Sequence, residues 1–329
     1  MGDLSPDALM AAASALSERG QGRTAPNPNV GCIIVAGGRV GGRGWTQPGG
    51  RPHAEAMALA EAGAEARGAT VYTTLEPCAH VSARGPACSD LLASAGVARV
   101  VVALTDPDPR TAGEGIARLR AAGIAVDEGV GAVAARVAMA GFLTRQARHR
   151  PHVTLKLATS LDGCIALAGG ESRWITGAEA RAHAHLERSR HEAILVGRGT
   201  LEADAPRLDV RLPGLEARTP RRVVLTTTGA APKGWDAIST PEAIAGLDGV
   251  DHVLVEGGAK TAAAFLARDL VDRLLLYRAP ILIGAGKASL GDIGLHRLAE
   301  AHGRWTLADA RRLGSDRLEV YERTQCLPA

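Results

Sequence analysis

Aromatic side chains are scarce in this chain of 329 residues, making up only 3% of it. Its cores must therefore rest on Val, Leu, Ile and Ala, and it has no run of aromatics on which single-stranded bases could stack. Charge of one sign is scarce as well, because the formal net charge is only +3. That excess is too small for the basic surface of a nucleic-acid-binding protein. We therefore expect a small-molecule substrate and no nucleic acid.

Long apolar runs and a leader pattern are also missing. No apolar run approaches the roughly 18 residues of a membrane span, and the N-terminus has no basic stretch followed by an apolar one. The five cysteines are few and unevenly spaced, which favours a metal site or free thiols over a disulfide framework. These absences predict a cytoplasmic protein that does not bind membranes.

Helical and strand patterns alternate along both halves of the chain, which predicts an α/β fold. The expected strands cover residues 31–35, 70–75, 97–104, 152–158, 193–196, 222–226, 253–255 and 273–277. The expected helices cover residues 7–19, 53–62, 89–95, 115–122, 178–188 and 261–268. A basic run at residues 144–150, followed by Pro151, interrupts the alternation. We therefore predict two domains, residues 1–146 and residues 151–329.

Three short segments of the first half carry ligands typical of a catalytic zinc site: His53-Ala54-Glu55, Pro77-Cys78 and Cys88. One imidazole and two thiolates leave the fourth position of zinc open for a water. Glu55, two residues after His53, can then move protons between that water and a departing amine. The spacing resembles the His-x-Glu…Pro-Cys-x-x-Cys signature of zinc deaminases, except that the two cysteines lie ten positions apart.

Two alternatives stay open at this point. A structural zinc site would need a fourth ligand, for which His80 is the obvious candidate, but Glu55 would then have no purpose. The chain could also be a zinc deaminase of another base or nucleoside, with a second domain that only binds a nucleotide.

The second half lacks the Gly-x-Gly-x-x-Gly fingerprint of a Rossmann domain. Gly257 and Gly258 follow an expected strand and precede an expected helix, an arrangement that lets the backbone approach a phosphate. Similar glycines at residues 197–200 and 284–286 favour a phosphate-rich ligand, although most such turns bind nothing. Lys156 lies on an otherwise apolar strand and needs a partner. We expect Lys156 to contact the reacting sugar or the cofactor.

Taken together, the motifs resemble the bifunctional deaminase/reductase family of riboflavin biosynthesis, the RibD type. The resemblance runs from about residue 7 to residue 321. Its motifs are Pro-Asn-Pro-Asn-Val-Gly at 26–31, His-Ala-Glu at 53–55, Thr-Leu-Glu-Pro-Cys at 74–78, Asp-Pro-Asp-Pro at 106–109, Ser-Leu-Asp-Gly at 160–163, Glu-Ser-Arg-Trp-Ile-Thr at 171–176, Ala-Ile-Leu-Val-Gly at 193–197 with Gly-Thr at 199–200, and Val-Glu-Gly-Gly at 255–258.

The resemblance implies a cytidine-deaminase-like three-layer α/β domain followed by a dihydrofolate-reductase-like α/β domain. The first would hydrolyse the 2-amino group of 2,5-diamino-6-ribosylamino-4(3H)-pyrimidinone 5′-phosphate with one zinc per chain. The second would reduce the ribosyl to a ribityl chain with NADPH. We also expect a homo-oligomer.

The resemblance also implies roles for individual residues. Asn27 would contact the pyrimidine, and His80 and Arg84 would face the base or its phosphate. The cofactor would be lined by Ala158, Trp174, Thr200 and Asp204, in addition to Gly257 and Gly258. The reductase substrate would be held by Ser172, Arg188, Leu208, Arg211 and Glu256, in addition to Lys156.

Three departures from the family pattern fall on the substrate side of the deaminase site. Thr46 stands where a histidine is common, and Asp108 stands where the family has asparagine. The loop from Cys78 to Cys88 is one residue longer than usual.

Overall fold

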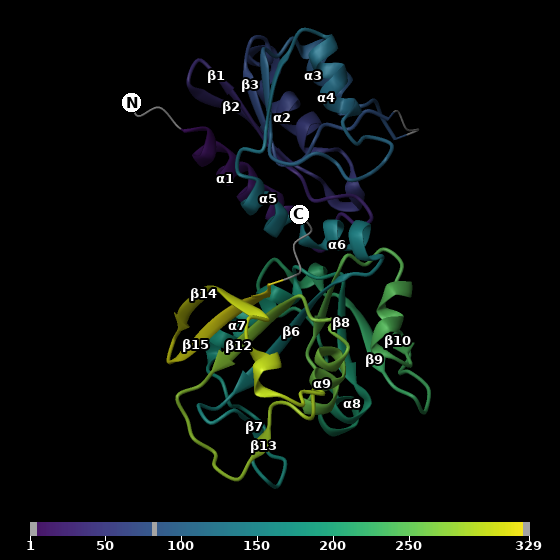
Figure 1. The fold of residues 1–329 in the computed structure, drawn as a ribbon, viewed down its shortest axis with the longest axis vertical. Coiled ribbons are helices and arrows are strands. Elements are labelled where there is room, and N and C mark those ends of the chain that lie inside the picture. Colours follow the sequence, from purple (N-terminus) through teal and green to yellow (C-terminus); the bar gives the residue numbers. More distant parts are fainter. Residues whose placement is uncertain (1–4, 81–83, 325–329) are drawn as a thin grey trace. The chain divides into compact units, whose positions relative to one another are not determined.

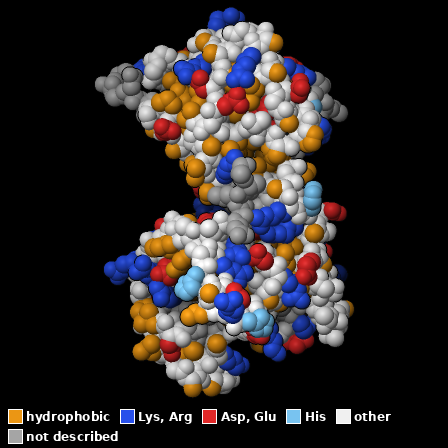
Figure 2. All heavy atoms as spheres, viewed as in Figure 1, with side chains coloured by type: hydrophobic (Ala, Val, Ile, Leu, Met, Phe, Trp, Pro, Cys, Tyr) orange, Lys and Arg blue, Asp and Glu red, His pale blue; other side chains and the backbone are white. Residues whose placement is uncertain are grey.

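The computed structural model describes residues 5–80 and 84–324, and it divides the chain into two compact units, residues 1–147 and 148–329 (Figure 1). Each unit has its own sheet and its own core of buried apolar side chains. None of the described helices has both the length and the apolar character that crossing a membrane requires. On the face drawn in Figure 2, positive and negative side chains are interspersed over both units.

The first unit is built on a five-stranded sheet in the order β2-β1-β3-β4-β5. The pairs β1–β2 and β1–β3 are antiparallel, whereas β3–β4 and β4–β5 are parallel. These strands are β1 (Gly31–Ala36), β2 (Arg39–Trp45), β3 (Thr70–Thr73), β4 (Arg99–Val102) and β5 (Ala125–Glu128).

Helices cover both faces of this sheet and give three layers (Figure 1). On one face lie α1 (Pro6–Ser17) and α5 (Ala132–Ala138), and on the other lie α2 (Ala54–Ala62), α3 (Cys88–Ala95) and α4 (Glu114–Ala121). The unit ends in α6 (Ala140–Arg148). Short 3-10 helices are η1 (Glu18–Gly20), η2 (Pro48–Gly50) and η3 (Gly63–Ala66).

Two glycines in β2 determine how closely α2 approaches the sheet. A Cβ added at Gly44 would lie 2.0 Å from the carbonyl oxygen of Ala54, and one at Gly42 would lie 2.2 Å from that of Ala58. Any larger residue at either position would push α2 away from the strand. The start of α2, where His53 and Glu55 lie, is therefore held at a fixed height over the sheet.

The second unit is built on an eight-stranded sheet in the order β10-β9-β8-β11-β6-β12-β15-β14. The pairs β12–β15 and β15–β14 are antiparallel, and the other five neighbouring pairs are parallel. Its strands are β6 (His152–Thr159), β8 (Ala193–Gly197), β9 (Arg221–Leu225), β10 (Asp236–Ile238), β11 (His252–Val255), β12 (Arg273–Arg278), β14 (Trp305–Leu313) and β15 (Asp316–Arg323). A separate pair joins β7 (Cys164–Ala166) to β13 (Lys287–Ala288).

Side chains that alternate along β12 serve two cores. Leu275 and Tyr277 pack with Ala180 and Ala184 of α7 (Ala178–Arg188). Leu274 belongs to the other core, together with Phe265 of α9 (Ala259–Ala267). Because neighbouring strand residues point to opposite faces, α7 and α9 cover opposite sides of the sheet. The remaining helices are α8 (Arg198–Asp204), η4 (Glu216–Arg218), η5 (Pro241–Gly246) and η6 (Leu298–Ala301).

All the expected strands and helices are present, but several elements were not anticipated. Among them, β2 carries three glycines, and the edge strand β14 is exposed at nearly every position, so neither has the apolar pattern of a buried strand. Residues 280–283, which precede the glycine turn at residues 284–286, form no strand. The basic run at residues 144–150 begins inside α6, which ends at Arg148.

Candidate active sites

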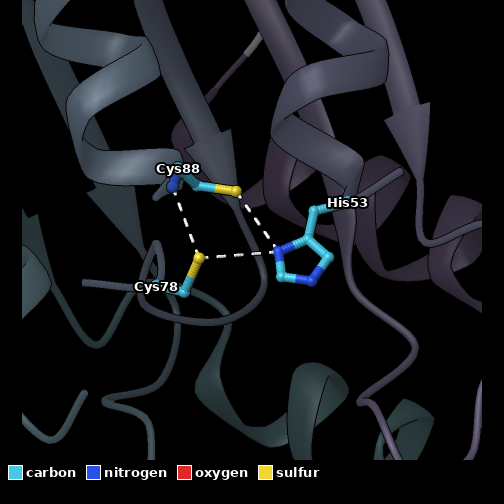
Figure 3. Close-up of side chains that lie close together, drawn as sticks. All are labelled: His53, Cys78 and Cys88. Atoms are coloured by element: carbon cyan, nitrogen blue, oxygen red, sulfur yellow. Dashed lines mark hydrogen bonds between the residues drawn. The ribbon is translucent and has the colours of Figure 1, made fainter. Parts of the chain in front are cut away.

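His53, Cys78 and Cys88 come from three different elements and meet at one point (Figure 3). His53 immediately precedes α2, Cys78 lies in the loop after β3, and Cys88 is the first residue of α3. The Nδ1 atom of His53 lies 3.3 Å from Sγ of Cys88 and 3.6 Å from Sγ of Cys78. All three ligand atoms lie within 4.8 Å of one another, a grouping found nowhere else in the described part of the chain.

The start of α3 favours a negative charge on Cys78. The N–H group of Cys88 donates to Sγ of Cys78 over 3.3 Å, so a helix N-terminus faces the thiolate. The pKa of Cys78 falls to about 4, first because of its hydrogen bond with the Cys88 side chain and then because of His53. The helix expected over residues 89–95 begins one residue earlier, at Cys88.

Glu55 lies in the first turn of α2, is buried, and faces the same cavity as His53 and Cys78. Burial raises the pKa of its carboxyl group, which suits a residue that takes up and releases protons. The cavity has a volume of about 210 Å³. One imidazole nitrogen and two sulfurs beside a small cavity, with a carboxylate next to them, fit a zinc ion with one open position.

Glu76 fixes the wall of this cavity opposite α2. Its carboxylate accepts hydrogen bonds from the backbone N–H groups of Asp106, Gly113 and Ile116, at 3.1, 2.9 and 3.1 Å. The buried side chain thereby ties the end of β3 to the loop after β4 and to the N-terminus of α4. Glu76 of the Glu-Pro-Cys segment therefore supports the site by holding the backbone of two other segments in place.

The second unit contains a larger cavity of about 470 Å³. Its walls come from β6, α7, the start and end of α8, and the end of β11. Ten residues that the sequence assigns to the cofactor or the reductase substrate line it: Lys156, Ala158, Ser172, Trp174, Arg188, Thr200, Asp204, Leu208, Arg211 and Glu256. These residues are far apart in the sequence, and the parallel strands bring them together.

Glu256 is the centre of charge in this second cavity. Its carboxylate accepts two hydrogen bonds from the Arg188 guanidinium, at 2.7 and 2.9 Å, and lies 3.7 Å from Nζ of Lys156. Burial alone would raise the pKa of Glu256, but Lys156 and Arg188 outweigh it and hold the value at about 2. The partner that the charge of Lys156 requires is therefore Glu256.

Gly257 and Gly258 lie beside the second cavity without lining it. The N–H group of Gly258, which precedes α9, donates to the Thr200 hydroxyl over 3.1 Å. A Cβ at Gly257 would lie 2.5 Å from Cβ of Thr261. These glycines therefore allow α9 and α8 to pack closely behind the cavity wall, and contact with a phosphate stays a prediction.

Comparisons with known proteins agree with this architecture. Residues 5–104 match the cytidine and deoxycytidylate deaminase zinc-binding region, and residues 151–244 and 242–318 match the RibD C-terminal domain. The riboflavin biosynthesis protein RibD of Aquifex aeolicus is 37% identical over 89% of this chain and 91% of its own length. That of Escherichia coli is 38% identical over 93% of this chain and 96% of its own length.

Solved structures give the same result over both units together. RibD of Acinetobacter baumannii superimposes with a TM-score of 0.87 at 35% identity, covering 97% of this chain and 99% of its own. A Thermotoga maritima diaminohydroxyphosphoribosylaminopyrimidine deaminase/5-amino-6-(5-phosphoribosylamino)uracil reductase gives 0.85 at 30% identity, covering 97% and 98%. The chain belongs to the RibD family.

As a RibD protein, the chain is a bifunctional enzyme of riboflavin biosynthesis, with a deaminase domain followed by a reductase domain. This confirms the expected α/β fold class, with a cytidine-deaminase-like domain joined to a second α/β domain that is the RibD C-terminal domain. Its deaminase domain is a zinc-binding domain, and its substrate is a small molecule.

The residues that the RibD resemblance assigns to the deaminase substrate do not all meet. Asn27 and His80 line the deaminase cavity, and Nδ2 of Asn27 lies 3.5 Å from Nε2 of His53. His80 lies outside the ligand group, with Nδ1 3.4 Å from the Thr111 hydroxyl, which argues against a structural zinc with a fourth ligand. Arg84 lines a neighbouring cavity of about 290 Å³ and donates to the carbonyl oxygen of Gly49 over 2.7 Å.

Two of the departures from the family pattern lie inside the deaminase cavity. Thr46 is buried there, and its hydroxyl accepts a hydrogen bond from the N–H group of Val30 over 2.9 Å. Asp108 also lines the cavity and forms an ion pair with Arg110. Residues 81–83, in the lengthened loop between the cysteines, lie outside the described residues.

Sequence reasoning missed two arginines. Arg110 lines the deaminase cavity, and its position directly after the Asp-Pro-Asp-Pro motif was a signal that could have drawn attention to it. Arg181 of α7 lines the reductase cavity with its guanidinium 4.8 Å from the ring centre of Trp174. No sequence pattern links that pair, because seven positions separate the two residues and a helix begins between them.

Proposed function

We propose that the chain removes the 2-amino group of 2,5-diamino-6-ribosylamino-4(3H)-pyrimidinone 5′-phosphate and then reduces the ribosyl group of the product to a ribityl chain. The observation that carries the first step is the buried Glu55 carboxyl group facing one cavity with His53 and Cys78. The second step is supported by the cation-rich cavity of the other unit, which suits a phosphate-bearing cofactor and substrate.

In the deaminase unit, His53, Cys78 and Cys88 hold the zinc ion. When bound, zinc lowers the pKa of a water molecule toward neutrality. Glu55 accepts a proton from the attacking water and delivers one to the departing amine, for which its raised pKa is suited. Asn27 orients the pyrimidine, and His80 and Arg84 contact the base or its phosphate.

In the reductase unit, NADPH supplies the hydride, and the protein orients the nicotinamide toward the sugar carbon. The residues assigned to the cofactor are Ala158, Trp174, Thr200, Asp204, Gly257 and Gly258. The residues assigned to the substrate are Lys156, Ser172, Arg188, Leu208, Arg211 and Glu256. Lys156 contacts the reacting sugar or the cofactor. Normal reduction with unchanged affinities in Lys156→Met would contradict that role.

We propose that residues 1–146 and 151–329 act as separate catalytic domains. A reductase fragment should nevertheless begin at Arg148, because Arg150 is buried and its Nη1 atom lies 2.6 Å from Oδ2 of Asp272. The same Asp272 carboxylate also accepts a hydrogen bond from the N–H group of Val153 in β6 over 2.9 Å. A fragment that starts at residue 151 would leave Asp272 without that arginine.

We further propose a cytoplasmic homo-oligomer. The edge strand β14 supports self-association, because it is exposed at nearly every position and pairs on only one side within the sheet. Light scattering on the purified chain tests this, and a monomeric mass over the micromolar range would contradict it.

The experiment that tests the function offers the zinc-loaded protein the diaminopyrimidinone ribosyl phosphate and follows ammonia release and NADPH oxidation together. Ammonia should appear without NADPH, and NADPH oxidation should begin only after deamination. If no ammonia appears while zinc is bound, the substrate assignment fails. A deaminase of another base or nucleoside then becomes the leading hypothesis, and free bases and nucleosides are the substrates to try.

A further inference from the structure

The deaminase cavity carries an unusual balance of charge. Four carboxyl groups line it, those of Glu55, Glu76, Asp106 and Asp108. Within the described residues 5–80 and 84–324, Arg110 is the only Lys or Arg in its lining. Away from the zinc ligands, a phosphate dianion that enters this cavity would therefore be attracted chiefly near Arg110.

Three of the four carboxyl groups are buried, those of Glu55, Glu76 and Asp106. Glu76 is buried and accepts three backbone hydrogen bonds, from Asp106, Gly113 and Ile116. Glu55 is buried beside the ligand cluster. Oδ1 of Asp106 accepts a hydrogen bond from the N–H group of Asp108 over 2.9 Å. The charged side chains with exposed surface for an incoming phosphate are therefore those of Asp108 and Arg110.

Asp108 holds the Arg110 guanidinium in one orientation. Nε of Arg110 lies 3.0 Å from each carboxylate oxygen of Asp108, and Nη2 donates to Oδ2 over 2.5 Å. The backbone N–H group of Arg110 also donates to Oδ1 of Asp108 over 3.0 Å. A guanidinium has five N–H donors, so the Nη1 edge keeps both of its hydrogens for another acceptor. Among the described residues no acceptor contacts Nη1.

The guanidinium is thus preorganised while its outer edge faces solvent. The Arg110 side chain is 69% exposed, whereas the Asp108 side chain is 18% exposed. Its ion pair neutralises the one carboxylate nearest to it, and its fork geometry matches a phosphate group. Arg84, the other arginine considered for the phosphate, instead lines the cavity shared by Arg51 and Gly85.

We propose that Arg110, oriented by Asp108, binds the 5′-phosphate of the deaminase substrate and gives the deaminase its preference for the phosphorylated form. This inference rests on the proposed deamination of a pyrimidine ribosyl phosphate. It assigns the selection of that substrate to the Asp-Pro-Asp-Pro-Arg segment at residues 106–110.

The test measures ammonia release by the zinc-loaded full chain from the diaminopyrimidinone ribosyl phosphate and from the same compound without its phosphate. Arg110→Gln should raise the KM for the phosphorylated form about tenfold to a hundredfold, because charge-assisted hydrogen bonds are lost. The KM for the form without phosphate and the kcat for both should stay within about twofold. Arg110→Lys, which keeps the charge without the fork, should fall between Arg110→Gln and the wild type.

The matched control is Arg120→Gln. Arg120 is also an exposed arginine in an ion pair, with Nη2 2.8 Å from Oε1 of Glu128, but it does not line the cavity. This variant should behave as the wild type on both substrates. Zinc content and melting temperature of each variant show that any change arises in a folded, loaded enzyme.

Three results would overturn the inference. Arg110→Gln could leave both KM values unchanged, or it could lower activity equally on both substrates. Alternatively, Arg84→Gln could be the variant that loses the preference for phosphate. A wild-type enzyme that releases no ammonia from the phosphorylated form would instead contradict the proposed function, and the inference with it.

Discussion

The deaminase and reductase sites of this chain differ in how they are assembled and in how they are charged. The ligand cluster is supplied by His53 and by two cysteines ten positions apart, beside a cavity of about 210 Å³. The reductase cavity of about 470 Å³ draws on residues from Lys156 to Glu256 and is rich in arginine. Zinc chemistry needs particular donor atoms at fixed separations, whereas a hydride cofactor needs chiefly a surface of the right shape and charge.

The largest effect should come from the acid–base group of the first site. Glu55→Gln should lower the deamination rate by about 10²- to 10⁴-fold, because the amide can neither accept nor return the proton. Zinc binding should persist, because the three ligands are unchanged. Reduction of the already deaminated intermediate should continue at the wild-type rate. Ammonia release, NADPH oxidation and zinc content are the three measurements.

The control for that substitution lies on the same helix. Glu61 is exposed and pairs with Arg43 over 2.6 Å, so Glu61→Gln should leave both activities intact. If Glu55→Gln abolished reduction as well, in a protein that still unfolds cooperatively, the two sites would not be independent and the contrast between them would collapse.

The corresponding change in the second site acts through charge. Glu256→Gln keeps the shape of the side chain but leaves Lys156 and Arg188 without their counter-charge in a buried position. We expect the free energy of unfolding of the second unit to fall by about 3 kcal/mol. Reduction should be impaired and deamination unaffected. Denaturant unfolding together with the two activity assays measures this.

A surface carboxylate of the same unit serves for comparison. Glu242 pairs with Arg268 over 2.7 Å, and both side chains are about half exposed. Glu242→Gln should change the stability by less than about 1 kcal/mol. Equal effects of the two substitutions would mean that the Glu256 cluster does not organise the cavity.

The two sites also differ in how much of them the sequence reveals. His53, Cys78 and Glu55 could be assigned from residue types and spacing, because few arrangements other than a catalytic zinc site use them together. The position of Arg110 after the Asp-Pro-Asp-Pro motif could have drawn attention to it, but its role could not be assigned, because its hydrogen bonds to Asp108 depend on how the loop after β4 folds. The hydrogen bond that supports the Cys78 thiol also depends on folding, because its N–H group belongs to Cys88, ten positions along the chain.

In the reductase unit, the sequence identified Lys156 as a charge in need of a partner but not what that partner is. Glu256 lies one hundred positions away and meets it only because β6 and β11 are neighbours in the sheet. Contacts distant in the sequence also explain why sequence analysis missed strand β2. In β2 the glycines serve the packing of α2, and an apolar pattern is absent as a result.

Buried histidines should give the second unit a stability that rises with pH. Burial lowers the pKa of His152 to about 3 and that of His191 to about 4, from an ordinary value of 6.5. As the pH drops below 6.5, the two histidines therefore bind protons in the unfolded chain but stay neutral in the folded chain. Burial raises the pKa of Glu322 to about 7, from 4.5. Between these two values the folded chain binds a proton on Glu322 that the unfolded chain does not bind, and this offsets one of the two histidine protons.

Between about pH 4.5 and 5.5 the surplus is about one proton, so stability should rise by about 1.4 kcal/mol per pH unit there. His152→Asn should reduce this slope by a similar amount, whereas His296→Asn, at an exposed position, should not change it. Urea unfolding of the full chain, followed by tryptophan fluorescence at several pH values, gives the slope. A stability that is flat or falls over this range would contradict the neutral, buried state of these histidines.

The smallest effect concerns the contact between α8 and the start of α9. The Thr200 hydroxyl accepts the Gly258 N–H group over 3.1 Å, and Thr200 also lines the reductase cavity. Thr200→Val keeps the shape and removes the acceptor, so the second unit should lose about 1 kcal/mol of stability and the KM for NADPH should rise a few-fold. Thr200→Ser keeps the hydroxyl and should retain most of the stability and of the NADPH affinity.

If the Val and Ser variants behave alike in melting temperature and NADPH affinity, this hydrogen bond does not shape the cofactor side of the cavity. The reductase site would then depend on its charges alone, which would sharpen its contrast with the deaminase site.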